Sequence, residues 1–206
     1  MVTRVAGILL AAGDGTRLGQ PKATVELGGL TLAERGVRLL RDGGADPALV
    51  VTGAVPVAIP GALSVPNPDW ESGMGSSLAA GLRALTSDMA SEASAVVIAL
   101  ADQPLIGAEA VRRLIAAHSG GDGVAVAAYG GKPRNPVLIG RAHWAAVLET
   151  AAGDTGARPF LRAHPDLVTL VECGDAGSPD DIDTPADLAR VRERLLRSGE
   201  PKARSL

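Results

Sequence analysis

Short apolar runs recur along this chain, separated by segments whose apolar residues return every three or four positions. Runs that are apolar at nearly every position are typical of strands buried on both faces of a parallel sheet. We expect such strands at Val5–Leu10, Ala48–Thr52, Ala95–Leu100 and Val124–Tyr129. The run at 95–100 is the most continuous, which favours a central place in the sheet. Less regular strands are expected at 63–65, 136–139 and Val168–Glu172.

The segments between the apolar runs carry the end signals of helices. Thr31 and Glu34 form a capping box ahead of a helix that continues to about residue 42. Ser76 or Ser77 is suited to cap a later helix that includes Leu82. Further helices are expected over 108–118, over 143–150 and from Pro185 onward, with Thr184 as the capping residue.

The order of these elements predicts an α/β fold with a mostly parallel central sheet. A strand followed by a loop, a helix and a second strand indicates a right-handed crossover between parallel neighbours. The 206 residues suffice for one domain with a sizeable core, which we place at 1–197. The polar tail 198–206 is expected to be disordered.

Composition narrows the classes of function. The formal net charge of −3 argues against general binding of nucleic acid. Every apolar run is shorter than the roughly 18 residues of a membrane span, so no membrane partner is expected. The one cysteine, Cys173, excludes an internal disulfide and a thiolate metal cluster. A cytoplasmic protein is the simplest interpretation.

The segment after the first strand combines glycines with basic side chains. Gly13, Gly15 and Gly19 allow the backbone to adopt positive φ and to approach a ligand closely. Consecutive amides in such a loop form a nest for an anion. Arg17 and Lys22 add positive charge beside it. This combination suits the polyphosphate of a nucleotide.

The spacing of this loop differs from that of two common phosphate-binding loops. It lacks the GxxxxGK[ST] pattern of the P-loop, and three residues separate Gly15 from Gly19, which does not fit GxGxxG. The second strand ends in Thr52-Gly53 rather than in the carboxylate that a dinucleotide fold requires. A dehydrogenase is therefore disfavoured. A glycine-rich turn with incidental charges is the alternative interpretation.

Asp102 directly follows the strand that we place at the centre of the sheet. The carboxyl ends of parallel strands face the ligand-binding crevice of such folds. A carboxylate there is placed to hold Mg²⁺ against phosphate oxygens. An aspartate that only starts a turn before Pro104 is the alternative.

Several segments together resemble one enzyme family. The stretch LAAGDGTRLGQPK at 10–22 resembles the signature of nucleotidyltransferases with a Rossmann-like fold, and is most similar to that of the molybdenum cofactor nucleotidyltransferases of the MobA and MocA type. Likenesses to the MocA type continue in NPDWESGMGSS at 67–77 and GDTGAR at 153–158, and DIDTPADL at 181–188 resembles the end of the family. The resemblance runs from Val5 to about Val191. It implies a three-layer, glycosyltransferase-A-like α/β fold.

The resemblance also implies roles for individual residues. The catalytic residues would be Arg17, Lys22 and Asp102. The nucleotide would contact Leu10, Ala11, Ala12, Gly13, Gly15, Thr16, Arg17 and Lys22, with Ser72, Gly73, Met74 and Ser77 near its base and ribose. Mg²⁺ would be held by Asp102 and Asp183, with Asp181 as the reserve ligand. The acceptor would lie near Asn135, Pro136, Asp154 and Arg158.

Two of these assignments have structural alternatives. Asp154 is equally suited to cap a helix and to pair with Arg158. The aspartates before Thr184 are a normal complement to a helix N-terminus.

The implied activity is transfer of a nucleoside monophosphate from a triphosphate to the phosphate of a molybdopterin-type cofactor, with release of pyrophosphate. CTP or GTP would be the donor and Mg²⁺ the cofactor, and a molybdoenzyme or its chaperone a possible partner. Ala12 matches the cytidylyl form of the motif, whereas Leu10 departs from it. CTP is therefore favoured as the donor, with GTP as the alternative.

Two other functions fit parts of the sequence. An enzyme of the same fold acting on a sugar or polyol phosphate would share the first loop, but the segments 67–77 and 154–158 fit it less well. A non-catalytic nucleotide-binding protein would not need both Lys22 and Asp102.

Overall fold

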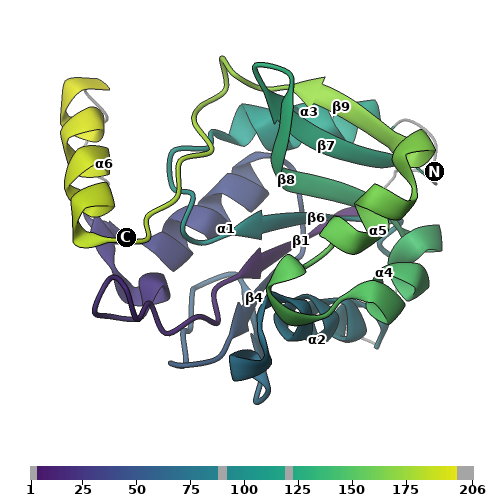
Figure 1. Ribbon diagram of the computed structural model, residues 1–206, viewed down its shortest axis with the longest axis horizontal. Helices are drawn as coiled ribbons and strands as arrows, with labels where there is room; N and C mark the ends of the chain where they lie inside the picture. The colour runs from purple at the N-terminus through teal and green to yellow at the C-terminus, as the bar shows by residue number, and fades with distance from the viewer. Residues whose placement is uncertain (1–3, 88–91, 119–122, 199–206) are drawn as a thin grey trace.

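The computed structural model describes residues 4–87, 92–118 and 123–198, and over these residues helices cover both faces of a central sheet (Figure 1). The strands of this sheet are β1 Val5–Leu10, β4 Ala48–Thr52, β5 Leu63–Pro66, β6 Ala95–Leu100, β7 Val124–Tyr129, β8 Lys132–Gly140 and β9 Val168–Glu172. They lie in the order β5-β4-β1-β6-β8-β7-β9. A separate hairpin consists of β2 (Glu26–Leu27) and β3 (Leu30–Thr31).

Most neighbouring strands of the sheet are parallel. β1 runs parallel to β4 and β6, β4 to β5, and β7 to β9, whereas β8 is antiparallel to both of its neighbours. β6 lies in the middle of the order, as its continuous apolar run predicted. The α/β class with a mostly parallel sheet is therefore confirmed.

The sheet separates two halves of the core, and helices cover each half. The helices are α1 Leu32–Asp42, α2 Met74–Thr86, α3 Ala108–Ala117, α4 Trp144–Thr150, α5 Arg158–Ala163 and α6 Pro185–Ser198. One face of the sheet packs against α1 and α3, with Leu9 and Leu40 fully buried there. The other face packs against α2, α4 and α5, with Ile8 and Phe160 in its core. Successive residues of a strand point to opposite faces, so Ile8 and Leu9 serve different halves.

α6 stands apart from the sheet at one end of the molecule (Figure 1). Leu188 and Val191 on this helix pack with Leu18, Leu27 and Ile182 in a third cluster of buried residues. The cluster joins the loop after β1 to the segment that precedes α6. It therefore holds two segments together that are far apart in the sequence.

Two of the predicted helix starts are confirmed. Thr31 and Glu34 form the expected capping box of α1. At the start of α6, the amide of Asp187 donates to the hydroxyl of Thr184 at 3.2 Å, and the amide of Thr184 donates to the carboxylate of Asp187 at 2.9 Å. Both caps consist of residues three positions apart, which a local sequence pattern can predict.

The predicted cap of α2 at Ser76 or Ser77 is wrong. The helix begins at Met74, after Gly73, whose φ of 107° lies in the left-handed region. The serine hydroxyls serve tertiary contacts instead, because the side-chain amide of Asn67 donates to Ser76 at 2.9 Å and to Ser77 at 3.0 Å. Side-chain hydrogen bonds thus connect the segment before α2 to the helix, but no side chain caps the helix.

The C-terminal prediction needs a small correction. Ser198 is the last residue of α6 rather than the first of a tail, and 199–206 lie outside the described residues. Over the part of the chain that the structure describes, no helix combines the length and the apolar character needed to cross a membrane. Cys173 is buried and is not part of a disulfide, as the sequence predicted.

Candidate active site

The carboxyl ends of β1 and β6 lie side by side. Leu10 pairs with Leu100, and the amide of Ala101 donates to the carbonyl of Leu10 at 3.1 Å. The loop after β1 and the segment with Asp102 therefore leave the sheet at the same edge. This edge is where open α/β sheets place their ligands.

The loop after β1 is shaped by its own backbone. The amides of Leu18 and Gly19 donate to the carbonyl of Gly15 at 2.8 and 2.9 Å. Gly15 and Gly19 have φ values of 66° and 83°, whereas Gly13 does not use its freedom to adopt a positive φ. A Cβ on Gly15 would lie 2.0 Å from the carbonyl oxygen of Gln20, so this position requires glycine.

The residues predicted to contact the nucleotide differ in exposure. The first three, Leu10, Ala11 and Ala12, are buried and continue the core of the sheet. The exposed residues of the loop are Gly13, Asp14, Thr16, Arg17, Gly19 and Gln20. Contacts with a ligand would therefore come mainly from the second half of the loop.

Asp14 accepts hydrogen bonds from two donors of Thr16 that were expected to be available to a bound phosphate. Its carboxylate accepts from the amide of Thr16 at 3.1 Å and from the hydroxyl of Thr16 at 2.7 Å. The hydroxyl holds the pKa of Asp14 below its usual value, and the amide adds to the effect. Sequence reasoning missed this contact, although an aspartate two positions before a threonine is a common turn signal.

An ion cluster lies where three distant segments meet. The ammonium nitrogen of Lys22 is 2.7 Å from Oδ2 of Asp102 and 2.5 Å from Oδ1 of Asp183. The guanidinium of Arg17 is 3.1 Å from Oδ2 of Asp183. The structure therefore brings together four of the residues that were singled out from the sequence. Lys22, Asp102 and Asp183 keep only 21–29% of their side-chain surface exposed.

The charges in the cluster stabilise one another. Burial favours the neutral amine of Lys22, but the carboxylates of Asp102 and Asp183 outweigh it and raise the pKa of Lys22. The hydrogen bond from Lys22 lowers the pKa of Asp183. The lysine and this aspartate are therefore both charged at neutral pH.

The position of Asp183 is fixed from both sides. The preceding residue, Ile182, is fully buried, and its amide donates to the carbonyl of Asp102 at 2.8 Å. The amide of Asp183 itself donates to Asp187 in the first turn of α6, at 3.2 Å. The two carboxylates of the cluster are thus held together by the backbone as well as by Lys22.

Asp181 lies outside the bonds of Lys22 and has a partner of its own. Its Oδ1 accepts from the side-chain amide of Gln103 at 2.7 Å. Gln103 is buried and also donates to the carbonyl of Pro179 at 3.3 Å. Burial raises the pKa of Asp181. Gln103 was missed from the sequence, because nothing local indicates that it contacts a segment far along the chain.

One carboxylate oxygen of the cluster indicates that it could bind a divalent cation. Oδ1 of Asp102 is buried and accepts no hydrogen bond within the described residues, which is costly for a carboxylate oxygen unless another group satisfies it. Asp102 and Asp183 could hold Mg²⁺. In the part of the chain that the structure covers, no group of three or more potential ligands is preassembled. Two carboxylates suit Mg²⁺, which keeps water and substrate phosphates as its other ligands.

The segment before α2 meets the loop before α5. A Cβ on Gly73 would lie 2.5 Å from the carbonyl carbon of Gly153 and 2.7 Å from a carboxylate oxygen of Asp154. A Cβ on Gly156 would lie 3.1 Å from the sulfur of Met74. The two segments assigned by resemblance to the nucleotide and to the acceptor therefore pack on each other. Ser77 is buried, and its hydroxyl accepts from the side-chain amide of Asn67.

The alternative in which Asp154 caps a helix and pairs with Arg158 is wrong. The residue that precedes α5 is Ala157, and no side chain caps it. Within the described residues, Asp154 and Arg158 form no ion pair with each other. Asp154 lies in a separate 3-10 turn, Gly153–Thr155, which ends at Gly156 with a φ of 54° before α5 begins.

Asn135 and Pro136 lie on β8, and Ser72 precedes Gly73. Val137 of β8 pairs with Ile98 of β6, so the antiparallel register places Asn135 and Pro136 toward the carboxyl end of β6. The hydroxyl of Ser72 donates to the carbonyl of Asp69 at 2.7 Å. In the described part of the chain, none of these three residues forms a hydrogen bond or ion pair with the Lys22 cluster.

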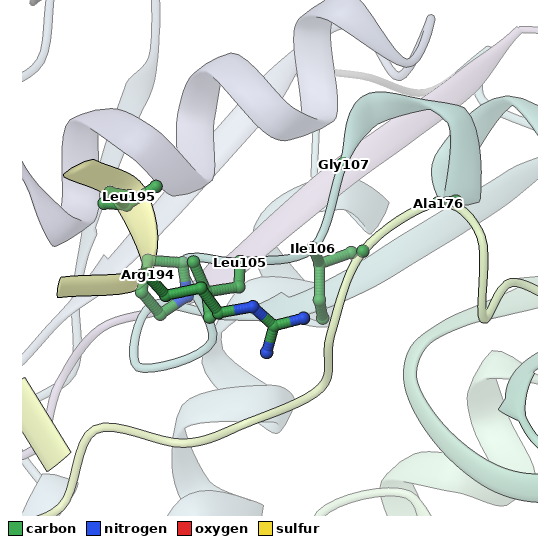
Figure 2. Close-up of a pocket in the computed structure, with 8 residues that line it drawn as sticks. Leu105, Ile106, Gly107, Ala176, Arg194 and Leu195 are labelled. Carbon is green, nitrogen blue, oxygen red and sulfur yellow. The ribbon is translucent and has the colours of Figure 1, made fainter. Parts of the chain in front are cut away.

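A pocket of about 270 Å³ lies next to the segment that follows Gln103 (Figure 2). Figure 2 shows it between the chain at Leu105 and Ile106 and the helix that carries Arg194 and Leu195. Its complete lining is Pro104, Leu105, Ile106, Gly107, Ala176, Gly177, Arg194 and Leu195. The residues predicted for the site do not line it, so we do not assign the nucleotide to this pocket.

Two proteins whose names state an activity are similar to this chain over nearly its whole length. Nicotine blue oxidoreductase of Paenarthrobacter nicotinovorans is 38% identical over 201 residues, which cover 91% of this chain and 96% of the relative. Molybdenum cofactor guanylyltransferase of Rhodobacter capsulatus is 30% identical over 95% of this chain and 98% of its own. The two names describe different activities.

Solved structures show the same fold. The homologue of Mycobacterium tuberculosis Rv0371c from Mycobacterium sp. strain JC1 is 31% identical and has a TM-score of 0.81, covering 95% of this chain and 98% of that one. Rv0371c of Mycobacterium tuberculosis H37Rv in complex with manganese is 23% identical and has a TM-score of 0.74, covering 94% of this chain and 100% of that one. The predicted fold is confirmed by these likenesses.

The sequence profile described as the MobA-like NTP transferase domain matches residues 7–168. This range begins in β1, contains the loop and Asp102, and ends at the start of β9. The resemblance noted from the first loop is thereby confirmed at the level of the family, whereas the MocA subtype is not. The chain belongs to the MobA-like NTP transferase family.

Proposed function

We propose that the protein is a Mg²⁺-dependent nucleotidyltransferase that moves CMP from CTP to the phosphate of a molybdopterin-type cofactor and releases pyrophosphate. The observation that carries the proposal is the cluster of Lys22, Asp102, Asp183 and Arg17 at the carboxyl edge of the sheet. It supplies two cations for phosphates and two carboxylates for a metal. Membership of an NTP transferase family supports the reading of these charges as a triphosphate site.

The chemistry needs positioning more than it needs a nucleophilic side chain. The acceptor phosphate is already anionic at neutral pH and would attack the α-phosphorus of the donor in line with the departing pyrophosphate. Lys22 and Arg17 would bind the triphosphate and offset the charge that develops on the leaving group. Asp102 and Asp183 would hold Mg²⁺, which when bound neutralises phosphate oxygens. The manganese complex of Rv0371c supports a divalent cation.

The donor and acceptor are the finer parts of the proposal. Ala12 and the segment 153–158 favour CTP by their likeness to the MocA type, whereas the relative from Rhodobacter capsulatus is a guanylyltransferase. That relative supports a molybdenum cofactor as acceptor. A sugar or polyol phosphate is the alternative acceptor, and a molybdoenzyme or its chaperone would receive the product.

One relative favours a second candidate function. The 38% identity to nicotine blue oxidoreductase extends over most of the chain and favours an oxidoreductase that acts on nicotine blue. The charge cluster favours transfer over reduction, because hydride transfer from a nicotinamide needs neither a metal-binding carboxylate nor a pair of cations beside it. The test must therefore distinguish an oxidoreductase from a nucleotidyltransferase.

The test measures two products in parallel. Purified protein is incubated with Mg²⁺, CTP or GTP, and molybdopterin-type cofactor, and pyrophosphate is quantified. A second reaction with NADH or NADPH and a quinoid dye follows loss of nicotinamide absorbance. We expect acceptor-dependent pyrophosphate release, larger with CTP. Dye reduction without pyrophosphate release would support the second function and contradict the first.

A further inference from the structure

The charges of the candidate site are already balanced without any ligand. Lys22 and Arg17 contribute two positive charges, and Asp102 and Asp183 contribute two negative charges. Each phosphate-binding cation is thus paired with a carboxylate that would bind the metal. This pairing stabilises the cluster while no ligand is bound, and it has to be broken when a metal and a triphosphate bind.

The ammonium of Lys22 lies where a bridging cation would have to lie. It contacts Oδ2 of Asp102 and Oδ1 of Asp183 at 2.7 and 2.5 Å. Magnesium–oxygen distances are only about 2.0–2.1 Å, so an ion between the same two oxygens would need the space that the ammonium fills. Oδ1 of Asp102 is the carboxylate oxygen that Lys22 leaves without a partner. It offers an entering cation a first ligand.

Resting on the proposed function, we propose that Lys22 and the divalent cation are alternative occupants of the Asp102–Asp183 pair, so that entry of the metal transfers Lys22 from the carboxylates to the phosphates of the nucleotide. The four-carbon stem of lysine allows this movement, because the charge is a point at the end of rotatable bonds. Arg17 is 72% exposed and can follow to the same phosphates.

A consequence is that metal binding and nucleotide binding are coupled through Lys22. Metal that enters without a nucleotide leaves the ammonium without a carboxylate, which penalises binding. A polyphosphate removes that penalty by giving Lys22 a new partner. Coupling of this kind is reciprocal, so each ligand raises the affinity for the other.

The test measures metal binding alone, without nucleotide. Free Mn²⁺ is followed by electron paramagnetic resonance during titration of the wild-type protein and of Lys22→Met, Lys22→Gln and Lys22→Arg. We expect the two neutral variants to bind Mn²⁺ at least tenfold more tightly than the wild type, and Lys22→Arg to bind no more tightly than the wild type. Lys22→Gln retains a hydrogen-bond donor for the carboxylates, which guards against loss of the fold in Lys22→Met.

A matched control removes a distant positive charge. Arg112→Met breaks the surface pair with Glu109 and should leave Mn²⁺ affinity within about twofold of the wild type. Equal or weaker Mn²⁺ binding by both neutral variants would overturn the exchange, while the transferase activity could still be found by pyrophosphate release. If Asp102→Asn binds Mn²⁺ as tightly as the wild type, the metal site itself is misplaced and the proposed function loses its carboxylate.

Discussion

Lys22 is the residue on which the candidate site converges. Its ammonium bonds two carboxylates that lie 80 and 161 positions away in the sequence. Burial of the ammonium is tolerated because both carboxylates pair with it, and the same interactions raise the pKa of Lys22. A single side chain thereby couples the loop after β1, the end of β6 and the segment before α6.

Replacing Lys22 or Asp102 with alanine should abolish most turnover. Loss of a well-aimed group that stabilises the transition state commonly costs about 10²–10³-fold in rate. We expect kcat/KM for pyrophosphate release to fall by about that factor in each variant. Circular dichroism should show a folded protein in both cases, because neither side chain is part of the three core clusters. Turnover within threefold of the wild type in either variant would contradict the assigned roles.

At the scale of elements, the site depends on one loop and one helix start. The loop after β1 reverses direction at Gly15, where no Cβ fits. The start of α6 fixes Asp183 through Thr184 and Asp187. Each can be perturbed without replacing the side chain of Lys22.

Two glycine substitutions in the loop should differ in their effect on folding stability. Gly15→Ala places a Cβ 2.0 Å from a carbonyl oxygen at a φ of 66°, and we expect a loss of about 1–3 kcal/mol in unfolding free energy. Gly13→Ala is the matched control, because a Cβ there meets no atom within 4 Å. It should change stability by less than about 0.5 kcal/mol. Urea unfolding measures both, and equal losses would refute the difference between the two positions.

The cap of α6 should make stability depend on pH. The hydroxyl of Thr184 is the main cause that lowers the pKa of Asp187 to about 2. An aspartate pKa that is lower in the folded state stabilises the protein above the unfolded value of about 4, and this stabilisation is lost as pH falls toward the folded value. We expect the melting temperature of the wild type to fall more steeply between pH 4 and 2 than that of Asp187→Asn.

A second variant checks the cause of this dependence. Thr184→Ala removes the hydroxyl that Asp187 accepts from and should flatten the same part of the curve. Asp175 has a similarly low pKa, about 2, because of Arg113, so a residual slope is expected in both variants. Parallel curves for the wild type and both variants would show that the cap does not carry the effect.

Local signals predicted more of the elements than of the site. The caps at Thr31 and Thr184 were predicted because both partners lie within four residues. The start of α2 was placed too late, at Ser76 or Ser77, whose hydroxyls bond Asn67 across a turn instead of capping the helix. A pattern that reads neighbours along the chain cannot see such a competing partner.

The same distinction applies to the charged residues. The sequence indicated Arg17, Lys22, Asp102 and Asp183 one by one, from strand ends and from family resemblance. It could not indicate that the lysine bonds both carboxylates, nor that Gln103 holds Asp181. These contacts depend on the order of strands in the sheet and on where α6 packs.

At the scale of the whole molecule, topology makes the site. β1 and β6 are neighbours in the sheet, so the loop and Asp102 emerge together. α6 packs against the loop side through Leu188 and Val191, which brings Asp183 to the same place (Figure 1). The candidate site therefore lies between the carboxyl edge of the sheet and the start of α6.

A ligand that contacts both the loop after β1 and the segment before α6 should stabilise the entire fold. Binding at 100 times the dissociation constant contributes about 2.7 kcal/mol to folding. We expect CTP with Mg²⁺ to raise the melting temperature more than GTP with Mg²⁺, and either nucleotide to have a smaller effect with EDTA. A larger shift with GTP would reverse the assignment of the donor, and shifts unaffected by EDTA would argue against a metal in the complex.

The most direct measurement is a crystal structure with Mg²⁺ and a CTP analogue that cannot be cleaved between its α- and β-phosphates. The account predicts the triphosphate beside residues 13–22, the cation on the carboxylate of Asp102, and the ammonium of Lys22 on a phosphate oxygen. A nucleotide bound away from this loop, with Lys22 still on both aspartates, would contradict it.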